Sequence, residues 1–141
     1  MIIRDALNEN VQYVEPDTPI AEVARLMKEH DCGAILVALD DRIEGIITDR
    51  DIALRCAAES LDPVTMTAEE CQTPNVLYCY EEDDVEDILQ NMASNAVRRL
   101  VVLNNNEEKR LIGMVSLGDL TKAYENKDAC GTALNEICLA A

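Results

Sequence analysis

The stretch Gly-Ile-Ile-Thr-Asp-Arg-Asp-Ile at residues 45–52 returns later in the chain as Gly-Met-Val-Ser-Leu-Gly-Asp-Leu at residues 113–120. Upstream of these blocks, residues 11–37 match residues 76–102 at a constant offset. The offset between the quoted blocks is larger because a polar insertion, residues 104–109, lengthens a hairpin tip in the second copy. One unit has therefore been duplicated, and we expect its two copies to be related by approximate two-fold symmetry.

Each copy predicts the same order of elements: strand, helix, strand, strand, helix. Apolar residues recur at spacings of three and four after Pro19 and after Asp84, which indicates one buried helical stripe in each copy. The expected strands are residues 11–14, 34–39 and 43–48 in the first copy, and 76–80, 100–103 and 111–116 in the second. The predicted fold class is α+β, two β-α-β-β-α repeats in which each small sheet packs on two helices.

Local signals place the ends of several elements. Thr18 is the expected N-cap of the first helix, with Pro19 at its first helical position. Asp83, three residues before Glu86, resembles a capping box for the corresponding helix of the second copy. Thr67 is expected to cap one short helical turn, and residues 40–42 to form a tight hairpin turn.

The repeat pattern divides the chain into three parts. We expect repeat 1 with an N-terminal segment at residues 1–62, repeat 2 at 63–126, and a tail at 127–141. The tail carries an apolar stripe: Ala133, Leu134, Ile137 and Cys138. On the second helices of the repeats, we expect apolar residues on the outside, namely Ile52, Cys56, Leu120 and Tyr124. Contiguous apolar patches normally mark an interface, so the sequence predicts a homodimer.

The charge balance excludes several classes of partner. The chain has 141 residues, with 28 acidic against 12 basic residues and a formal charge of −16. Such a charge disfavours nucleic acid and anionic membrane surfaces, and an anionic ligand would depend on locally placed arginines. The N-terminus lacks the apolar core of a signal peptide, so we expect a cytoplasmic protein.

The cysteines suggest neither disulfides nor a metal site. None of the six forms a C-x-x-C pair, and most fall on apolar faces of the expected elements, which is typical of reduced thiols in the cytosol. His30 and Cys32 lack a second ligand pair at a known spacing, so no metal is expected. The chain also lacks a Ser-His-Asp or Cys-His arrangement and any glycine-rich nucleotide loop, which argues against an enzyme.

Polar identity between the copies survives most clearly at Thr48 with Asp51 and at Ser116 with Asp119. A hydroxyl followed three residues later by a carboxylate is typical of a helix N-terminal cap. The same pair also suits a ligand, because a hydroxyl contacts phosphate and a carboxylate accepts both hydroxyls of a ribose. The two interpretations are compatible.

The duplicated blocks at 45–52 and 113–120 resemble the cystathionine-β-synthase (CBS) domain, and two such domains in tandem form a Bateman module. The resemblance covers about residues 11–124 and no attached enzyme. It implies that Thr48 and Asp51 in one cleft, and Ser116 and Asp119 in the other, contact the phosphate and ribose of AMP, ATP, NAD or S-adenosylmethionine. It also implies dimers associated through helices.

Three arginines are further candidates for phosphate contacts. Arg50 lies inside the first motif, where the second has Gly118, so the first cleft is expected to bind AMP or ATP more tightly. Arg98 and Arg99 either complete a phosphate site or pair with carboxylates such as Glu81, and strand alternation would send one of them to each face.

The resemblance therefore predicts a non-enzymatic regulatory module that requires no cofactor. It would bind an adenosine-containing ligand between its repeats and act on an unknown protein target. The alternative is a dimeric interaction or stress protein whose clefts bind nothing. In that case the caps keep Thr48 and Ser116 for stability alone.

Overall fold

The computed structural model describes residues 1–140, and its contacts divide the chain into two compact units. The first-repeat unit comprises residues 11–76, and the second-repeat unit combines residues 1–10 with residues 77 onward. This division by contact differs from the division by sequence repeat at 1–62, 63–126 and 127–141. The N-terminal segment lies in the unit of the second repeat, and residues 63–76 lie in the unit of the first.

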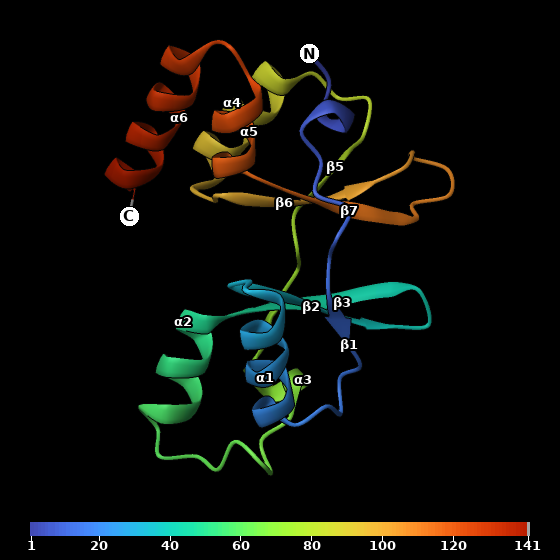
Figure 1. Ribbon diagram of the computed structural model, residues 1–141, viewed down its shortest axis with the longest axis vertical. Coiled ribbons are helices and arrows are strands. Elements are labelled where there is room, and N and C mark those ends of the chain that lie inside the picture. Colours follow the sequence, from blue (N-terminus) through green and yellow to red (C-terminus); the bar gives the residue numbers. More distant parts are fainter. Residues whose placement is uncertain (141) are drawn as a thin grey trace. The chain divides into compact units, whose positions relative to one another are not determined.

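The first-repeat unit contains a four-stranded sheet in the order β1-β2-β3-β4. Its strands are β1 (Tyr13–Val14), β2 (Ala34–Leu39), β3 (Arg42–Thr48) and β4 (Thr73–Pro74). β1 runs parallel to β2, and the other neighbours are antiparallel (Figure 1). Its helices are α1 (Ile20–His30), α2 (Asp49–Ile52) with a π-helical continuation η2 (Ala53–Ala57), and α3 (Ala68–Cys71). Ile20, Val23, Ile35 and Ile47 are fully buried in its aliphatic core.

The second-repeat unit contains a three-stranded sheet in the order β5-β6-β7. Its strands are β5 (Tyr78–Tyr80), β6 (Arg99–Leu103) and β7 (Leu111–Ser116). Its helices are a 3₁₀ turn η1 (Ile3–Asp5), α4 (Val85–Asn95), α5 (Leu117–Ala123) and α6 (Lys127–Ala140). The α+β fold class and the duplicated order of strand, helix, strand, strand, helix are confirmed. Among the helices between residues 1 and 140, none has the length and apolar content that crossing a membrane requires.

The segment that leads into each repeat pairs with the closing strand of the other repeat. Thr73, just before the second repeat, pairs with Ile46 on β3. Asn8, at the corresponding place before the first repeat, pairs with Met114 on β7 through two backbone hydrogen bonds of 3.0 Å each. This exchange explains why residues 1–10 belong to the second-repeat unit, and it brings a segment from outside each repeat to the closing strand of that repeat's sheet.

The start of α1 differs from the sequence prediction. Thr18 is not the N-cap, because the helix begins at Ile20 and its cap residue is Pro19, without a side-chain hydrogen bond. Backbone carbonyls of the following connection replace the side chain: the amide of Ile20 donates to the carbonyl of Met66 at 2.9 Å, and the amide of Ala21 donates to that of Pro63 at 2.9 Å. The first free helical donors are thus satisfied from residues distant in sequence.

The start of α4 is shifted by one residue. Asp84, rather than Asp83, is the N-cap, and its Oδ1 accepts from the amide of Glu86 at 2.8 Å. Asp83 instead accepts from the amide of Tyr80 at 2.8 Å, which closes the turn after β5. The Thr67 cap of α3 is confirmed. The expected hairpin turn is also confirmed, because Asp40 and Asp41 both have positive φ, as a type I′ turn requires.

The apolar residues expected on the outside of the second helices are largely covered. Cys56 is 2% exposed and Leu120 is fully buried, each within its own unit, and Ile52 and Tyr124 are partly buried. This part of the argument for a homodimer was therefore wrong. Cys56 on η2 lies in the core of the first-repeat unit, and α6 packs against α5 in the second-repeat unit. The exposed apolar residues of this region are different ones, namely Leu54, Leu61 and Val64.

Candidate functional site

Both duplicated motifs form complete capping boxes at a strand–helix junction. In the first, the amide of Asp51 donates to Thr48 Oγ1 at 3.1 Å, and the amide of Thr48 donates to Asp51 Oδ2 at 2.9 Å. In the second, the amide of Asp119 donates to Ser116 Oγ at 3.1 Å, and the amide of Ser116 donates to Asp119 Oδ2 at 2.9 Å. The capping role is therefore present at both sites.

The two carboxylates differ in their second oxygen. Asp51 Oδ1 lies 3.5 Å from Arg55 Nη2 in an ion pair one helical turn apart. Within residues 1–140, Asp119 Oδ1 has no hydrogen-bond or ion-pair partner. Both hydrogen bonds of this side chain, from the Ser116 amide at 2.9 Å and from Ser116 Oγ at 2.7 Å, end on Oδ2. Capping thus occupies one oxygen of each carboxylate and leaves the other oxygen of Asp119 available to a ligand.

Arg55 is a residue of the first site that the sequence analysis missed. Its Nη1 donates to the backbone carbonyl of Cys71 at 2.8 Å and to Thr73 Oγ1 at 3.0 Å, while Nη2 faces Asp51. It therefore links the motif to the exchanged strand β4. The i, i+4 spacing of Asp51 and Arg55 on a helix was the signal that would have found it.

Arg50 is exposed and forms no ion pair with any carboxylate of the described chain. Its neighbour Asp49 accepts the Arg50 amide at 2.9 Å, and Asp49 Oδ2 lies 3.3 Å from where a side chain at Gly33 would begin. A carboxylate therefore lies near the start of β2 in the first-repeat unit, where it would oppose an anionic ligand.

In the second-repeat unit, Arg98 and Arg99 both line a single pocket of about 680 Å³ together with Ser116. The expectation that strand alternation would separate the two arginines fails, because β6 begins at Arg99 and Arg98 precedes the strand. Neither arginine pairs with an acidic residue among those described; Glu81 and Glu82 pair instead with Arg4, at 2.9 and 3.4 Å. The hydrogen bond from Arg4 also lowers the pKa of Glu81.

Two lysines complete this pocket. Lys122 on α5 and Lys127 at the start of α6 line it, and no carboxylate is among its lining residues. Lys127 Nζ also donates to the backbone carbonyls of Thr121 and Tyr124, at the end of α5. We call the hollow bounded by Arg98, Arg99, Ser116, Lys122 and Lys127 the cationic pocket. The sequence analysis identified neither lysine; Lys127 begins the tail, which was not expected to approach the motif.

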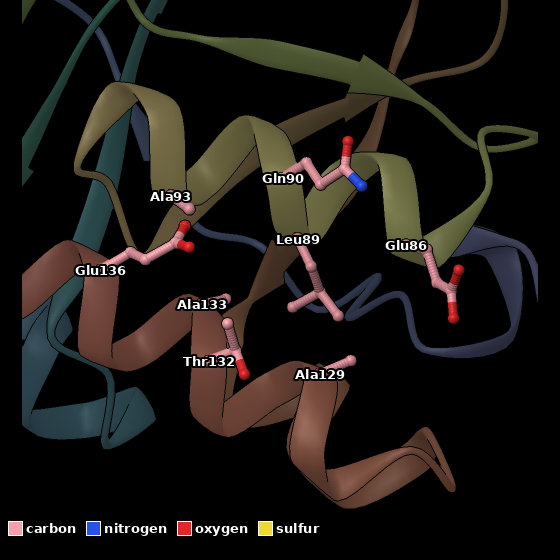
Figure 2. Close-up of a pocket in the computed structure, with 8 residues that line it drawn as sticks. All are labelled: Glu86, Leu89, Gln90, Ala93, Ala129, Thr132, Ala133 and Glu136. Carbon is pink, nitrogen blue, oxygen red and sulfur yellow. The ribbon is translucent and has the colours of Figure 1, made fainter.

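A second hollow, about 330 Å³, lies between α4 and α6 (Figure 2). Small side chains such as Ala93, Ala129 and Ala133 line it, and it carries the carboxylates Glu86 and Glu136. Its charge is opposite to that of the cationic pocket. No group of three or more His, Cys, Asp or Glu residues between residues 1 and 140 is arranged to hold a metal ion.

Comparison with known proteins gives one consistent family. The CBS domain pattern matches residues 3–57 and 68–126. The CBS domain-containing protein YhcV of Bacillus subtilis is 36% identical over 141 residues, which covers 96% of this chain and 94% of the relative.

Two solved structures illustrate the range of similar proteins. The crystal structure of Hypoxic Response Protein I with two coordinated zinc ions has a TM-score of 0.75 and 34% identity, and the match covers 86% of this chain and 98% of that one. A hexameric CBS-CP12 protein from bloom-forming cyanobacteria has a TM-score of 0.77 and 26% identity, with 91% and 74% of the two chains covered.

Proposed function

The chain belongs to the CBS domain family, and we propose that it is a non-enzymatic regulatory module that binds an adenosine-containing ligand at its duplicated motifs. The observation that carries the proposal is the second motif. There, the capping carboxylate of Asp119 keeps one oxygen unpartnered, and its capping partner Ser116 lines a pocket whose charged lining residues are all basic. Ribose and phosphate are the two groups that such a combination recognises.

The chemistry of each part supports this class of ligand. Asp119 Oδ1 accepts hydrogen bonds from ribose hydroxyls, and Arg98 and Arg99 neutralise phosphate oxygens. The pocket volume, about 680 Å³, falls within the range of small-molecule sites, about 300–1,000 Å³. At the first motif, Thr48, Arg50 and Asp51 offer a hydroxyl, a cation and a carboxylate, but both oxygens of that carboxylate already have partners, Thr48 and Arg55.

Binding of AMP, ATP, NAD and S-adenosylmethionine to the full chain, measured by calorimetric titration, tests the proposal. Asp119→Ala should weaken binding at the second site by about 1–3 kcal/mol through lost ribose hydrogen bonds, and Asp51→Ala should do so at the first site. Asn at either position should have a milder effect, because it retains capping ability.

The same variants test the alternative, a protein-interaction role without a ligand. The capping boxes favour it, because they account for both Ser/Thr–Asp pairs without any ligand. Removing the carboxylate leaves the backbone amide of Thr48 or Ser116 without its partner, and should lower the free energy of unfolding by about 1 kcal/mol. If the parent binds none of the four compounds while Asp51→Ala and Asp119→Ala still reduce stability, capping is the whole role of the motifs and the sensor proposal is wrong.

We also propose that the chain self-associates as a homodimer. Support comes from the exposed side chains of Leu54, Leu61 and Val64, which are 51%, 48% and 66% exposed, and from the hexameric relative. Light scattering at micromolar concentration should give about twice the monomer mass of 15.6 kDa, and Leu54→Glu should shift it toward the monomer. A monomeric parent would contradict the proposal.

The zinc ions of Hypoxic Response Protein I are not carried over to this chain. The ligand that the proposal assigns is organic, and no metal has a role in it.

A further inference from the structure

The two motifs differ in charge at positions that the duplication makes equivalent. The second repeat places Arg98, Arg99 and Lys122 around its motif, and all three line the cationic pocket. The equivalent residues of the first repeat carry no charge; they are Gly33, Ala34 and Leu54. Leu117 in the second motif replaces Asp49 in the first, so the first motif also keeps a carboxylate that the second lacks.

The C-terminal helix supplies a further part of the cationic pocket. Lys127, Cys130, Gly131 and Leu134 on α6 all line it. These residues lie four or fewer apart along one helical face, so they form a continuous wall with one charged end and an apolar middle. The first-repeat unit has no such helix after its motif, because the chain there continues from η2 into the connection to α3.

From this asymmetry we propose that the cationic pocket is selective for polyphosphates, and that α6 forms the wall that makes it so. The inference rests on the proposed function and assigns its ligand class: a nucleoside carrying two or three phosphates at the second motif. It reverses the ranking expected from Arg50, since one exposed arginine beside Asp49 provides less positive charge than the four cations that line the cationic pocket.

The net charge of the chain does not oppose this assignment. At physiological ionic strength, charges further away than about 8 Å are largely screened. The lining cations therefore dominate the potential inside the pocket, although the whole chain carries −16. Each additional phosphate group adds negative charge that the same four cations attract, so the affinity of the pocket should rise from AMP to ATP. The apolar residues of α6 offer a surface for the nucleoside.

Gly131 allows the wall to be altered without disturbing the helix. A Cβ built at Gly131 meets nothing within 4 Å, and the residue lines the pocket. Gly131→Glu should fold at least as stably as the parent, because glutamate favours the helix more than glycine does. It should weaken ATP binding at least about tenfold and AMP binding about threefold, since the new carboxylate opposes the phosphates. Calorimetric titration measures both affinities, and urea unfolding measures stability.

Thr132→Glu is the matched control. It adds the same charge to α6 one residue further along, where Thr132 faces the α4 side (Figure 2). We expect parent-like ATP affinity. Equal ATP affinity of Gly131→Glu and the parent would overturn the inference while leaving the proposed function intact. So would a larger loss of ATP binding on Arg50→Ala than on Gly131→Glu.

Inorganic tripolyphosphate separates this inference from the proposed function. If the parent binds tripolyphosphate and Gly131→Glu abolishes that binding, while no adenosine compound binds, the polyphosphate selectivity of the cationic pocket stands, and the proposal of an adenosine ligand is wrong. If the parent binds neither tripolyphosphate nor any of the nucleotides, both are wrong. If ATP binds more weakly than AMP at low salt, the polyphosphate assignment is wrong even though the module binds a nucleotide.

Discussion

Replacing Gly113 with alanine should destabilise the second-repeat unit by roughly 2–4 kcal/mol, at the upper end of overpacking effects. A Cβ at this position would lie 2.4 Å from Leu7 Cδ1 and 2.5 Å from the backbone oxygen of Asn8. The leucine side chain can rotate, but Asn8 is held by its two backbone hydrogen bonds to Met114. The new methyl group must therefore displace the exchanged N-terminal segment from β7, and urea unfolding should show an earlier transition.

The control for this substitution is the same chemical change in open space. Gly131→Ala on α6 meets no atom within 4 Å and should raise the free energy of unfolding by up to about 1 kcal/mol, through helix propensity alone. Opposite signs for the two variants support the close approach of residues 7–8 to β7. A loss smaller than about 0.5 kcal/mol for Gly113→Ala would mean that the N-terminal segment does not pair there in solution.

Gly45 is the equivalent position in the first-repeat unit, and it shows why the exchange matters. A Cβ there would lie 2.5 Å from Gln72 Oε1 and 2.8 Å from the backbone oxygen of Thr73. Both glycines thus admit the segment that leads into the other repeat. Glycine opens both duplicated blocks, at residues 45 and 113, because the packing of the fold leaves no room for a side chain there. This requirement does not depend on a ligand.

The repeat made most of the fold predictable. Two copies of one pattern gave the order of strands and helices, because spacing of apolar residues is a local signal. Strand β7 was expected at its observed limits, and β2 likewise. The exchange of leading segments was not predictable, since Asn8 and Met114 are far apart in sequence and no local pattern specifies a pairing of that range.

For the candidate site, local geometry was predictable and the distribution of charge was not. The capping boxes of Thr48 with Asp51 and Ser116 with Asp119 follow from a three-residue spacing. The cationic pocket depends instead on α6 folding back beside α5, which brings Lys127 to the motif. The sequence analysis identified the apolar residues of the tail but placed all four of them in one stripe. The structure buries Ala133 and Ile137 and leaves Leu134 and Cys138 exposed.

The attachment of α6 to α4 is specific to the second repeat. Leu89 and Ala93 on α4 face α6, and Leu89 is only 3% exposed (Figure 2). The equivalent residues of α1 are Ala24 and Lys28, which are exposed. A lysine and a shorter side chain at these positions would give α6 little to pack on. Within the described residues, α6 therefore packs on α4 and α5 of its own unit, and this packing positions the wall of the cationic pocket.

Ile137→Ala should accordingly reduce both stability and ligand binding. Ile137 is 4% exposed in the core of the second-repeat unit, and truncating a buried isoleucine costs about 2–5 kcal/mol. We expect the lower part of this range, because the residue lies near the end of α6, where the helix relaxes more easily.

Leu134→Ala is the control. Its side chain is 42% exposed, so the substitution should lower the free energy of unfolding by less than about 1 kcal/mol, measured by urea unfolding. Because Ile137 does not line the cationic pocket, a loss of ATP affinity in a still-folded Ile137→Ala protein would arise from loosening of α6. Equal stability of the two variants would show that α6 is not docked on α4, and the wall would then have no support.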